Sequence, residues 1–300
     1  MVATIWPVTD DFVAEIGDVD LAGPLSVENL AVIKGAFAKY AVLVFPDQNL
    51  TQEQHLDFAR NFGPLEDTGG VYGGRRSEGS RIRTDLGDVS NLAPDGTIWP
   101  ADSRLRMVLA SNKLWHADSS FKFVPANASL LYSHEVVPVG GMTEFADQRG
   151  AYDALSDDMK RKLDGLIVEH SFLFSRERMG FTDFTEEERI ALAPVPQLMV
   201  RTMPESGRKS LFLSSHAGQV KGMDKAGGRA LIDQLLEHAT QRQFVYRHRW
   251  RKNDVVIWDN RCTLHRGRDF DDLRYKREMH RATVSDQINS CEREGISVAA

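Results

Sequence analysis

Apolar positions near the start of the chain follow the spacing of a helix and then of a buried strand. Leu30, Ile33 and Phe37 recur on one helical face within residues 26–40, and the apolar run Val42-Leu43-Val44-Phe45 follows directly. This order predicts a helix that leads into a buried strand. Thr51, with Gln54 three residues later, has the capping-box pattern of a second helix, which Gly63-Pro64 should end.

From about residue 110 onward, short strand-like runs alternate with turns. Many short strands with few long helices favour a β-sandwich or barrel over a parallel sheet. Two further helices are expected to pack outside the sheets, and Leu231 and Leu235 share one stripe of the second. The predicted strands cover residues 129–137, 209–214, 243–250, 254–258 and 278–284, and these two helices cover residues 157–165 and 228–239.

The composition changes sharply between residues 67 and 83, where glycine is frequent and apolar residues are few. A surface loop is expected, and two readings stay open: an ordinary loop, or a mobile lid near residues 67–110 that closes over a site. The flanking segments contain no repeated units that would mark a linker. We therefore expect a single domain over residues 1–300.

Composition and charge limit the classes of partner. The chain has 300 residues, of which 42% are hydrophobic and 27% charged, as in ordinary globular proteins that bury a sizeable core. A net charge of −6 gives no general reason to expect nucleic acid, although the basic stretch at residues 247–252 needs its own explanation. A small-molecule partner is expected, and no interface signal decides whether the chain forms a homo-oligomer.

The sequence has no signal for a membrane or for secretion. No apolar run reaches the length of a membrane span, and the N-terminus lacks a basic region followed by a long apolar core. Two cysteines, Cys262 and Cys291, are too few for a disulfide scaffold and suit a reducing compartment. The expected location is cytoplasmic.

Candidate metal ligands are His116, Asp118 and the distant His265. Side chains alternate along an extended strand, so Asn112, Leu114, His116 and Asp118 should project to one side. Two histidines and one carboxylate form the facial triad that holds Fe(II) and leaves positions open for oxygen and a co-substrate. Zinc with a bound water is the alternative, and it would make the protein a hydrolase.

Two arginines follow the second histidine. In a strand over residues 278–284, alternation places Arg277 and Arg281 on the same face, where each can hold an anion in bidentate geometry. A surface strand whose arginines pair with Asp269, Asp271 or Asp272 is the alternative.

In four stretches the chain resembles the iron(II)- and 2-oxoglutarate-dependent dioxygenases of the taurine dioxygenase and 2,4-dichlorophenoxyacetate dioxygenase family. The resemblance runs from the segment at residues 17–21 through Thr283, and its interval from His265 to Arg277 is slightly longer than is usual in the family. It implies a mainly β fold with flanking helices, the double-stranded β-helix also called jelly roll or cupin-like. The stretches are residues 112–121 (NKLWHADSSF), 140–147 (GGMTEFAD), 258–266 (WDNRCTLHR) and 277–283 (REMHRAT).

The resemblance also implies roles for individual residues. His116, Asp118 and His265 would bind Fe(II), while Thr143 and Arg277 would hold the far carboxylate of the co-substrate 2-oxoglutarate, with O2 as oxidant. The family positions that lie near the primary substrate correspond to Asn112, Ser119, His216 and Arg281, and for His216 a purely structural role is equally open. Phe121 and Leu114 are expected to form an apolar wall.

The implied reaction is hydroxylation of a small organic anion with succinate and CO2 as co-products. An aryloxyalkanoate is the favoured substrate, and hydroxylation beside its ether oxygen would give a hemiacetal that breaks apart. The alternatives are a sulfonate or modified amino-acid hydroxylase of the same family, or a non-catalytic jelly-roll sensor of 2-oxoglutarate. The sequence does not choose among the substrates.

Overall fold

A seven-stranded sheet forms the largest part of the fold in a computed structural model that describes residues 2–66, 81–103, 106 and 110–298. Its strand order is β1-β2-β3-β13-β5-β15-β4, and all neighbours are antiparallel except β2 and β3. The strands are β1 (Thr4–Pro7), β2 (Val13–Gly17), β3 (Val42–Phe45), β4 (Gly87–Asp88), β5 (Ala126–Glu135), β13 (Val255–Asp259) and β15 (Glu278–Ser285).

Three smaller sheets complete the β structure of the described residues. The sheet that matters most for the site has the order β12-β6-β14, with β6 (Thr143–Asp147), β12 (Val245–His248) and β14 (Thr263–Gly267). It packs on the seven-stranded sheet through a buried cluster in which Phe145 of β6 contacts Trp258 of β13 at 5.4 Å between ring centroids. The others are β7 (Ile167–His170), β8 (Val195–Leu198) and β11 (Ala217–Val220), and the pair β9 (Val200–Thr202) and β10 (Lys209–Leu211).

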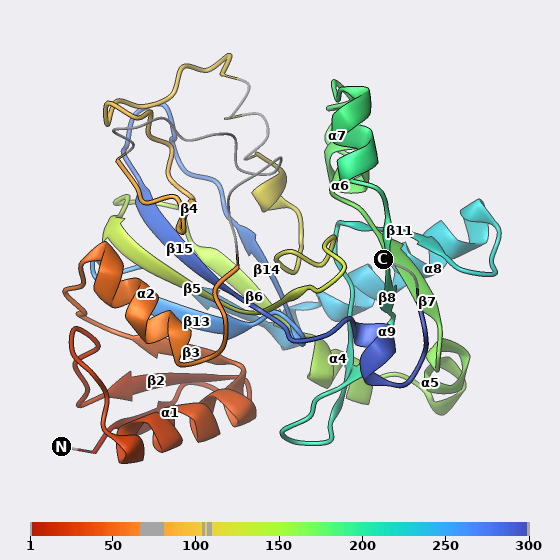
Figure 1. Ribbon diagram of the computed structural model, residues 1–300, viewed down its shortest axis with the longest axis horizontal. Coiled ribbons are helices and arrows are strands. Elements are labelled where there is room, and N and C mark those ends of the chain that lie inside the picture. Colours follow the sequence, from red (N-terminus) through yellow and green to blue (C-terminus); the bar gives the residue numbers. More distant parts are fainter. Residues whose placement is uncertain (1, 67–80, 104–105, 107–109, 299–300) are drawn as a thin grey trace.

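Helices lie on the outside of these sheets (Figure 1). Helices α1 and α2 lie beside the seven-stranded sheet, and α5 to α9 lie around the sheet of β7, β8 and β11. The helices are α1 (Val27–Tyr40), α2 (Gln52–Arg60), α4 (Gln148–Asp153), α5 (Asp157–Leu163), α6 (Phe172–Glu177), α7 (Glu186–Ala191), α8 (Lys225–Ala239), α9 (Ser290–Arg293) and the 3₁₀ turns η1 (Ala110–Lys113) and η2 (Arg242–Phe244).

The first two helices begin where the sequence predicted them, each after a capping residue. Ser26 accepts the backbone N–H of Asn29 at the start of α1, and the capping box of Thr51 and Gln54 is complete at the start of α2. The predicted strand Val42–Phe45 is β3. Together, the strands and helices described above confirm the predicted β-rich fold with flanking helices.

Several predicted boundaries are wrong. The run at residues 209–214 forms a strand only over its first three residues, and the run at 243–250 begins as the turn η2 before it becomes β12. The segment before His116 is also not extended from Asn112, because residues 110–113 form η1. Strand alternation alone does not detect such short turns, since their apolar residues still pack inward.

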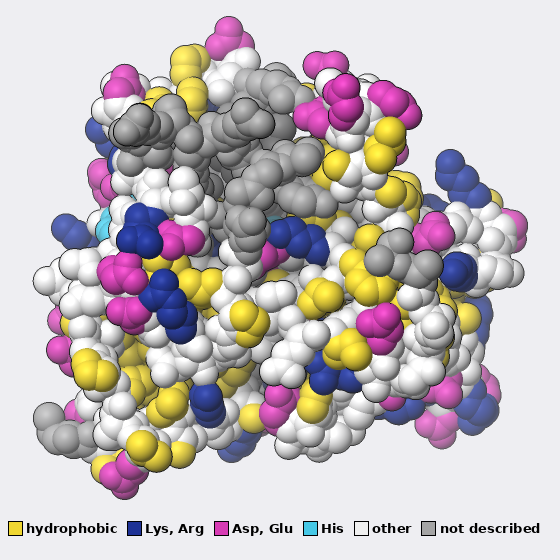
Figure 2. Space-filling model, in the orientation of Figure 1, with side chains coloured by type: hydrophobic (Ala, Val, Ile, Leu, Met, Phe, Trp, Pro, Cys, Tyr) yellow, Lys and Arg dark blue, Asp and Glu magenta, His cyan; other side chains and the backbone are white. Residues whose placement is uncertain are grey.

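The basic stretch at residues 247–252 has a structural role. Arg247 donates to Glu144 at 2.9 Å, and Arg251 donates to Glu15 at 2.9 Å and to the buried Asp254 at 3.1 Å. Figure 2 shows acidic and basic side chains interspersed over most of one face, with acidic side chains gathered over α7. Two arginines of the stretch therefore link neighbouring segments through ion pairs.

The proposed lid near residues 67–110 lies partly outside the described residues, which omit 67–80, 104–105 and 107–109. No helix of the described residues is long and apolar enough to cross a membrane. The lid motion, the cytoplasmic location and a homo-oligomer stay predictions.

We expect the free energy of unfolding to fall below pH 6.5, because burial lowers the pKa of His55 and of His170 to about 3. The folded pKa values lie below the unfolded value, so the stability is fully present above pH 6.5 and is lost as the unfolded chain takes up protons. Each histidine should cost about 2 kcal/mol at pH 5.

Urea unfolding at pH 7.5 and at pH 5.0 measures this difference. The control is His170→Phe, which keeps a ring where the imidazole stacks on Phe212 at 5.6 Å and should remove part of the pH dependence. Equal unfolding free energies at the two pH values would contradict the expectation.

Candidate active site

The candidate metal ligands meet where the segment before β5 pairs with β14. The backbone N–H of His116 donates to the carbonyl of His265 at 3.0 Å, and the reverse bond is 2.8 Å, so the two imidazole centroids lie 4.1 Å apart. A carboxylate oxygen of Asp118 lies 3.9 Å from Nε2 of His116, and the other lies 3.6 Å from Nε2 of His265. All three side chains are buried, and their ligand atoms lie within 4.8 Å of one another.

The orientation of these side chains suits a divalent transition metal. Nδ1 of His116 lies 2.8 Å from the carbonyl oxygen of Leu114, which leaves Nε2 directed at the centre. His265 is held by ring contacts to Trp258 at 4.6 Å and to Phe145 at 6.2 Å between centroids. Two imidazole nitrogens and one carboxylate on one side of a centre are the facial donor set of non-haem Fe(II).

Hydrogen bonds hold Asp118 as a carboxylate. Ser129 of β5 donates to Oδ2 at 2.7 Å, the side-chain oxygen of Asn260 accepts the backbone N–H of Asp118 at 3.0 Å, and Arg281 donates to Oδ1. Burial alone would raise the pKa of Asp118, but the charges of Arg281, His265 and His116 and the bond from Ser129 lower it to about 2. The ligand is therefore deprotonated at neutral pH.

Ser129→Ala is expected to weaken metal affinity by about 10- to 100-fold, because it removes the donor that fixes the orientation of the Asp118 carboxylate. Mn(II) titration of the metal-free protein by calorimetry measures the loss. The control is Ser133→Ala on the same strand, whose hydroxyl donates to the carbonyl of Arg251 at 2.7 Å. If both variants bind Mn(II) as the unaltered protein does, Ser129 has no such role.

A cavity of about 300 Å³ lies beside the two histidines, and we call it the active-site cavity. Strand alternation directs Thr143 of β6 and His265 of β14 into it, while Glu144 and Arg266 point to the other face of the same sheet. The described part of the proposed lid also contributes to its wall. Its lining includes Val89, Trp99, Asn112, Leu131, Thr143, Trp258, Phe270, Arg277 and Arg281.

Arg277 is a buried cation without an acidic partner among the described residues. Its side chain is 8% exposed, and the side-chain bond it makes is from Nη1 to the carbonyl of Val89 at 3.3 Å. Burial lowers the pKa of Arg277 to about 10, so the guanidinium stays charged at neutral pH. An unpaired charge in a low-dielectric site is costly, and an anionic ligand would offset that cost.

The surface-strand alternative for the two arginines is wrong. Arg281 pairs with Asp118 of the metal triad, whereas Asp269 pairs with Lys113 at 2.6 Å and Asp272 with Arg106 at 2.6 Å. Arg277 and Arg281 therefore line the active-site cavity and do not form a surface strand.

His216 and Ser119 do not line the active-site cavity. The His216 ring lies 6.3 Å from that of His116 and 4.7 Å from that of Phe121, and burial places its pKa well below the usual value. Ser119 has a positive φ of 50° and donates to Glu66 at 2.9 Å, which helps to turn the chain directly after Asp118. Phe121 and Leu114 are also absent from the lining, so the expected apolar wall is formed by other residues.

Several charged residues near the site were not predicted from the sequence: Arg106, Lys113 and Arg268 line the active-site cavity, and Arg176 lies close by. Arg176 of α6 lies 3.5 Å from the ring centroid of Phe172, whose ring stacks on His216 at 6.3 Å. Among the described residues it has no acidic partner, and burial lowers its pKa to about 9. A lone arginine in a six-residue helix carries no sequence pattern that would have singled it out.

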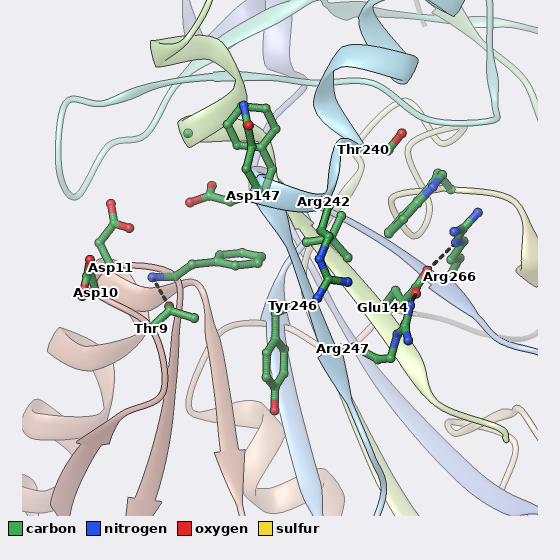
Figure 3. Close-up of a pocket in the computed structure, with 16 residues that line it drawn as sticks. Thr9, Asp10, Asp11, Glu144, Asp147, Thr240, Arg242, Tyr246, Arg247 and Arg266 are labelled. Atoms are coloured by element: carbon green, nitrogen blue, oxygen red, sulfur yellow. Dashed lines mark hydrogen bonds and ion pairs between the residues drawn. The ribbon is translucent and has the colours of Figure 1, made fainter. Parts of the chain in front are cut away.

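A larger cavity of about 760 Å³ lies on the other face of the β12-β6-β14 sheet (Figure 3). Trp115 lines it because side chains alternate there, and the guanidinium of Arg266 lies 4.4 Å from the Trp115 ring centroid. Glu144 accepts from Arg266 and Arg247 at 2.8 and 2.9 Å. None of the three candidate metal ligands lines this cavity.

Comparison with known proteins gives concordant matches. A family model described as "Taurine catabolism dioxygenase TauD, TfdA family" matches residues 4–283. An alpha-ketoglutarate-dependent 2,4-dichlorophenoxyacetate dioxygenase of Cupriavidus pinatubonensis is 46% identical over 275 residues, which are 92% of this chain and 95% of that protein.

A second relative and a solved structure agree. An (S)-phenoxypropionate/alpha-ketoglutarate-dioxygenase of Sphingobium herbicidovorans is 37% identical over 280 residues, covering 90% of this chain and 89% of that protein. A crystal structure of AAD-2 in complex with Mn(II) and N-oxalylglycine superposes with a TM-score of 0.89 at 45% identity, covering 97% of this chain and 99% of that one.

Proposed function

The chain belongs to the TauD, TfdA family of dioxygenases, and we propose that within this family it is an Fe(II)- and 2-oxoglutarate-dependent dioxygenase that hydroxylates an aryloxyalkanoate. The observation that carries the proposal is the placement of Arg277 and Arg281. Both guanidiniums line the cavity that also receives His116 and His265. Arg277 has no acidic partner among the described residues, whereas Arg281 contacts Asp118 of the triad. We assign the two guanidiniums to two different anions, a dicarboxylate co-substrate and an anionic substrate.

In this proposal His116, Asp118 and His265 hold Fe(II), and Arg277 with Thr143 binds the far carboxylate of 2-oxoglutarate. Thr143 is oriented for this role because its Oγ1 accepts the indole N–H of Trp250 at 2.9 Å, which leaves the hydroxyl proton to donate. When bound, iron, 2-oxoglutarate and O2 supply the oxidising chemistry, with succinate and CO2 as co-products.

The role of the remaining residues is to aim the substrate and exclude water. Arg281 would receive the substrate carboxylate, so that the adjacent carbon lies beside the metal, and Asn112 would contact the same substrate. Leu131, Trp258 and Phe270 line the cavity and would exclude water from the reacting carbon. Ser119 and His216 lie behind the cavity lining, and we infer that they shape the substrate pocket from there.

Hydroxylation of the carbon between the ether oxygen and the carboxylate would give a hemiacetal. The bond between the hemiacetal carbon and the ether oxygen then breaks, and the ether oxygen leaves as a phenolate. The hydroxyl proton passes to the phenolate, so that a phenol and an aldehyde acid or keto acid separate. The names of the relatives at 37–46% identity support this substrate class. A zinc hydrolase would give the buried charge of Arg277 no partner.

For the architecture we infer one domain over residues 1–300 with the double-stranded β-helix, or jelly-roll, arrangement. Its two facing sheets would be the seven-stranded sheet and the β12-β6-β14 sheet, which meet in one buried cluster. The match of the family model to residues 4–283 supports a single domain.

Product analysis tests the proposed function. Fe(II)-loaded protein with 2-oxoglutarate, ascorbate and air should convert an aryloxyacetate to the phenol and glyoxylate. A 3-arylpropionate, in which a methylene replaces the ether oxygen, is the matched substrate and should give a stable alcohol if it turns over. A stable hydroxylated product from the aryloxyacetate, or turnover only with sulfonates or acylated amino acids, would overturn the substrate assignment.

A further inference from the structure

A second cavity adjoins the active-site cavity at Arg277. It has a volume of about 280 Å³, and we call it the rear cavity. Its wall comes from the loop at residues 136–142, which joins β5 to β6, and from Arg249, Trp250 and Met279. The rear cavity and the active-site cavity share two lining residues, Gly141 and Arg277.

Gly141 and Arg277 form the partition between the two cavities, because they line both. Gly141 has a φ of +64°, and a Cβ added to it would lie 2.7 Å from Cγ2 of Val137 and 3.6 Å from Cδ of Arg277. A side chain is therefore excluded both by the backbone conformation and by contact. Cγ2 of Val137 and Cδ of Arg277 therefore both lie close to the position that a side chain of Gly141 would occupy.

The rear cavity opens to the surface beside a free cation. Val139 is 78% exposed, and Arg249 is exposed and has no acidic partner among the described residues. Arg277 lies at the inner end, and Trp250 in the wall donates to Thr143 of the active-site cavity at 2.9 Å. Positive charge thus marks both ends of the cavity, which favours the approach of a small dianion.

We propose that 2-oxoglutarate reaches Arg277, and that succinate leaves it, through the rear cavity. This inference rests on the proposed function, because it takes Arg277 as the residue that binds the far carboxylate. Arg249 would attract the dicarboxylate at the mouth, and a small displacement of Val137 beside Gly141 would open the partition. The primary substrate would use the other side of the active-site cavity, so that bound substrate does not block exchange of the dicarboxylate.

Anaerobic stopped-flow mixing tests the route without turnover. Fe(II)-loaded protein is mixed with 2-oxoglutarate in the absence of O2 and of any primary substrate, and the charge-transfer absorbance of the chelated keto acid gives association and dissociation rate constants. Arg249→Glu should lower the association rate constant about 3- to 10-fold at low ionic strength, and the loss should shrink at high salt. Arg161→Glu makes the same change of charge on a side chain that is 70% exposed in α5, and it should have little effect.

A second variant tests the partition itself. Val137→Trp should slow association and dissociation by the same factor and leave the dissociation constant unchanged, because a blocked passage alters both rates whereas a lost contact alters affinity. Unchanged rates in this variant, or equal effects of Arg249→Glu and Arg161→Glu, would overturn the inference. Failure of every protein to bind 2-oxoglutarate would instead refute the proposed function, so the two failures are distinguishable.

Discussion

His116→Ala is expected to abolish metal binding and to lower turnover by about 10³-fold or more, because it removes one of three ligands from a site in which metal chemistry supplies several kcal/mol of the barrier reduction. The remaining His265 and Asp118 lie on one side of the centre and cannot complete a facial set. Mn(II) titration by calorimetry and succinate formation with Fe(II) measure the two losses separately.

The matched control is His238→Ala, which removes a histidine from α8. Its Nε2 lies 2.8 Å from the carbonyl oxygen of Ala151 and makes no contact with the triad. We expect this variant to bind Mn(II) and turn over normally. An active His116→Ala enzyme would mean that the ligand set is wrong. If the protein were a non-catalytic sensor, the unaltered protein would bind 2-oxoglutarate but would form no succinate.

Arg277→Met is expected to weaken 2-oxoglutarate binding by about 10²- to 10³-fold, because truncating one partner of a buried charge pair costs about 2–5 kcal/mol. Methionine fills part of the space of the arginine stem without its charge. Titration of N-oxalylglycine or 2-oxoglutarate into the Mn(II)-loaded protein measures the affinity without turnover. Arg277→Lys should recover only part of it, since an ammonium lacks the bidentate geometry.

Arg281→Met distinguishes the two arginines. Because we assign Arg281 to the primary substrate, its loss should raise the KM for an aryloxyacetate and leave the affinity for 2-oxoglutarate nearly unchanged. The reverse pattern, with Arg281→Met losing 2-oxoglutarate and Arg277→Met retaining it, would exchange the two assignments. Mn(II) affinity should be recorded alongside, since Arg281 also contacts Asp118.

The sequence was sufficient to predict the parts of the site that depend on local spacing. Asp118 lies two residues after His116, and Arg277, directly before β15, lines the same cavity as Arg281 within that strand. The caps of α1 and α2 were also readable, because a capping side chain bonds within three residues of itself.

Other features depend on contacts between distant segments, which spacing does not encode. His265 pairs with His116 through an isolated β-bridge between distant segments of the chain. The residue types and the resemblance to a family predicted that the two histidines share a site, but spacing did not predict this bridge. The turn η1 and the positive φ of Ser119 replace the extended segment that alternation predicted. Arg176 lies beside Phe172 on the same helix, but its closeness to the site depends on the packing of Phe172 against the distant His216.

Succinate formation from 2-oxoglutarate by purified protein tests the central claim most directly. The assay contains Fe(II), ascorbate and O2, and its panel contains aryloxyalkanoates, sulfonates and acylated amino acids. We expect aryloxyalkanoates to stimulate succinate formation in proportion to phenol release. No succinate with any member of the panel, from protein that binds both iron and 2-oxoglutarate, would contradict the assignment as an aryloxyalkanoate dioxygenase.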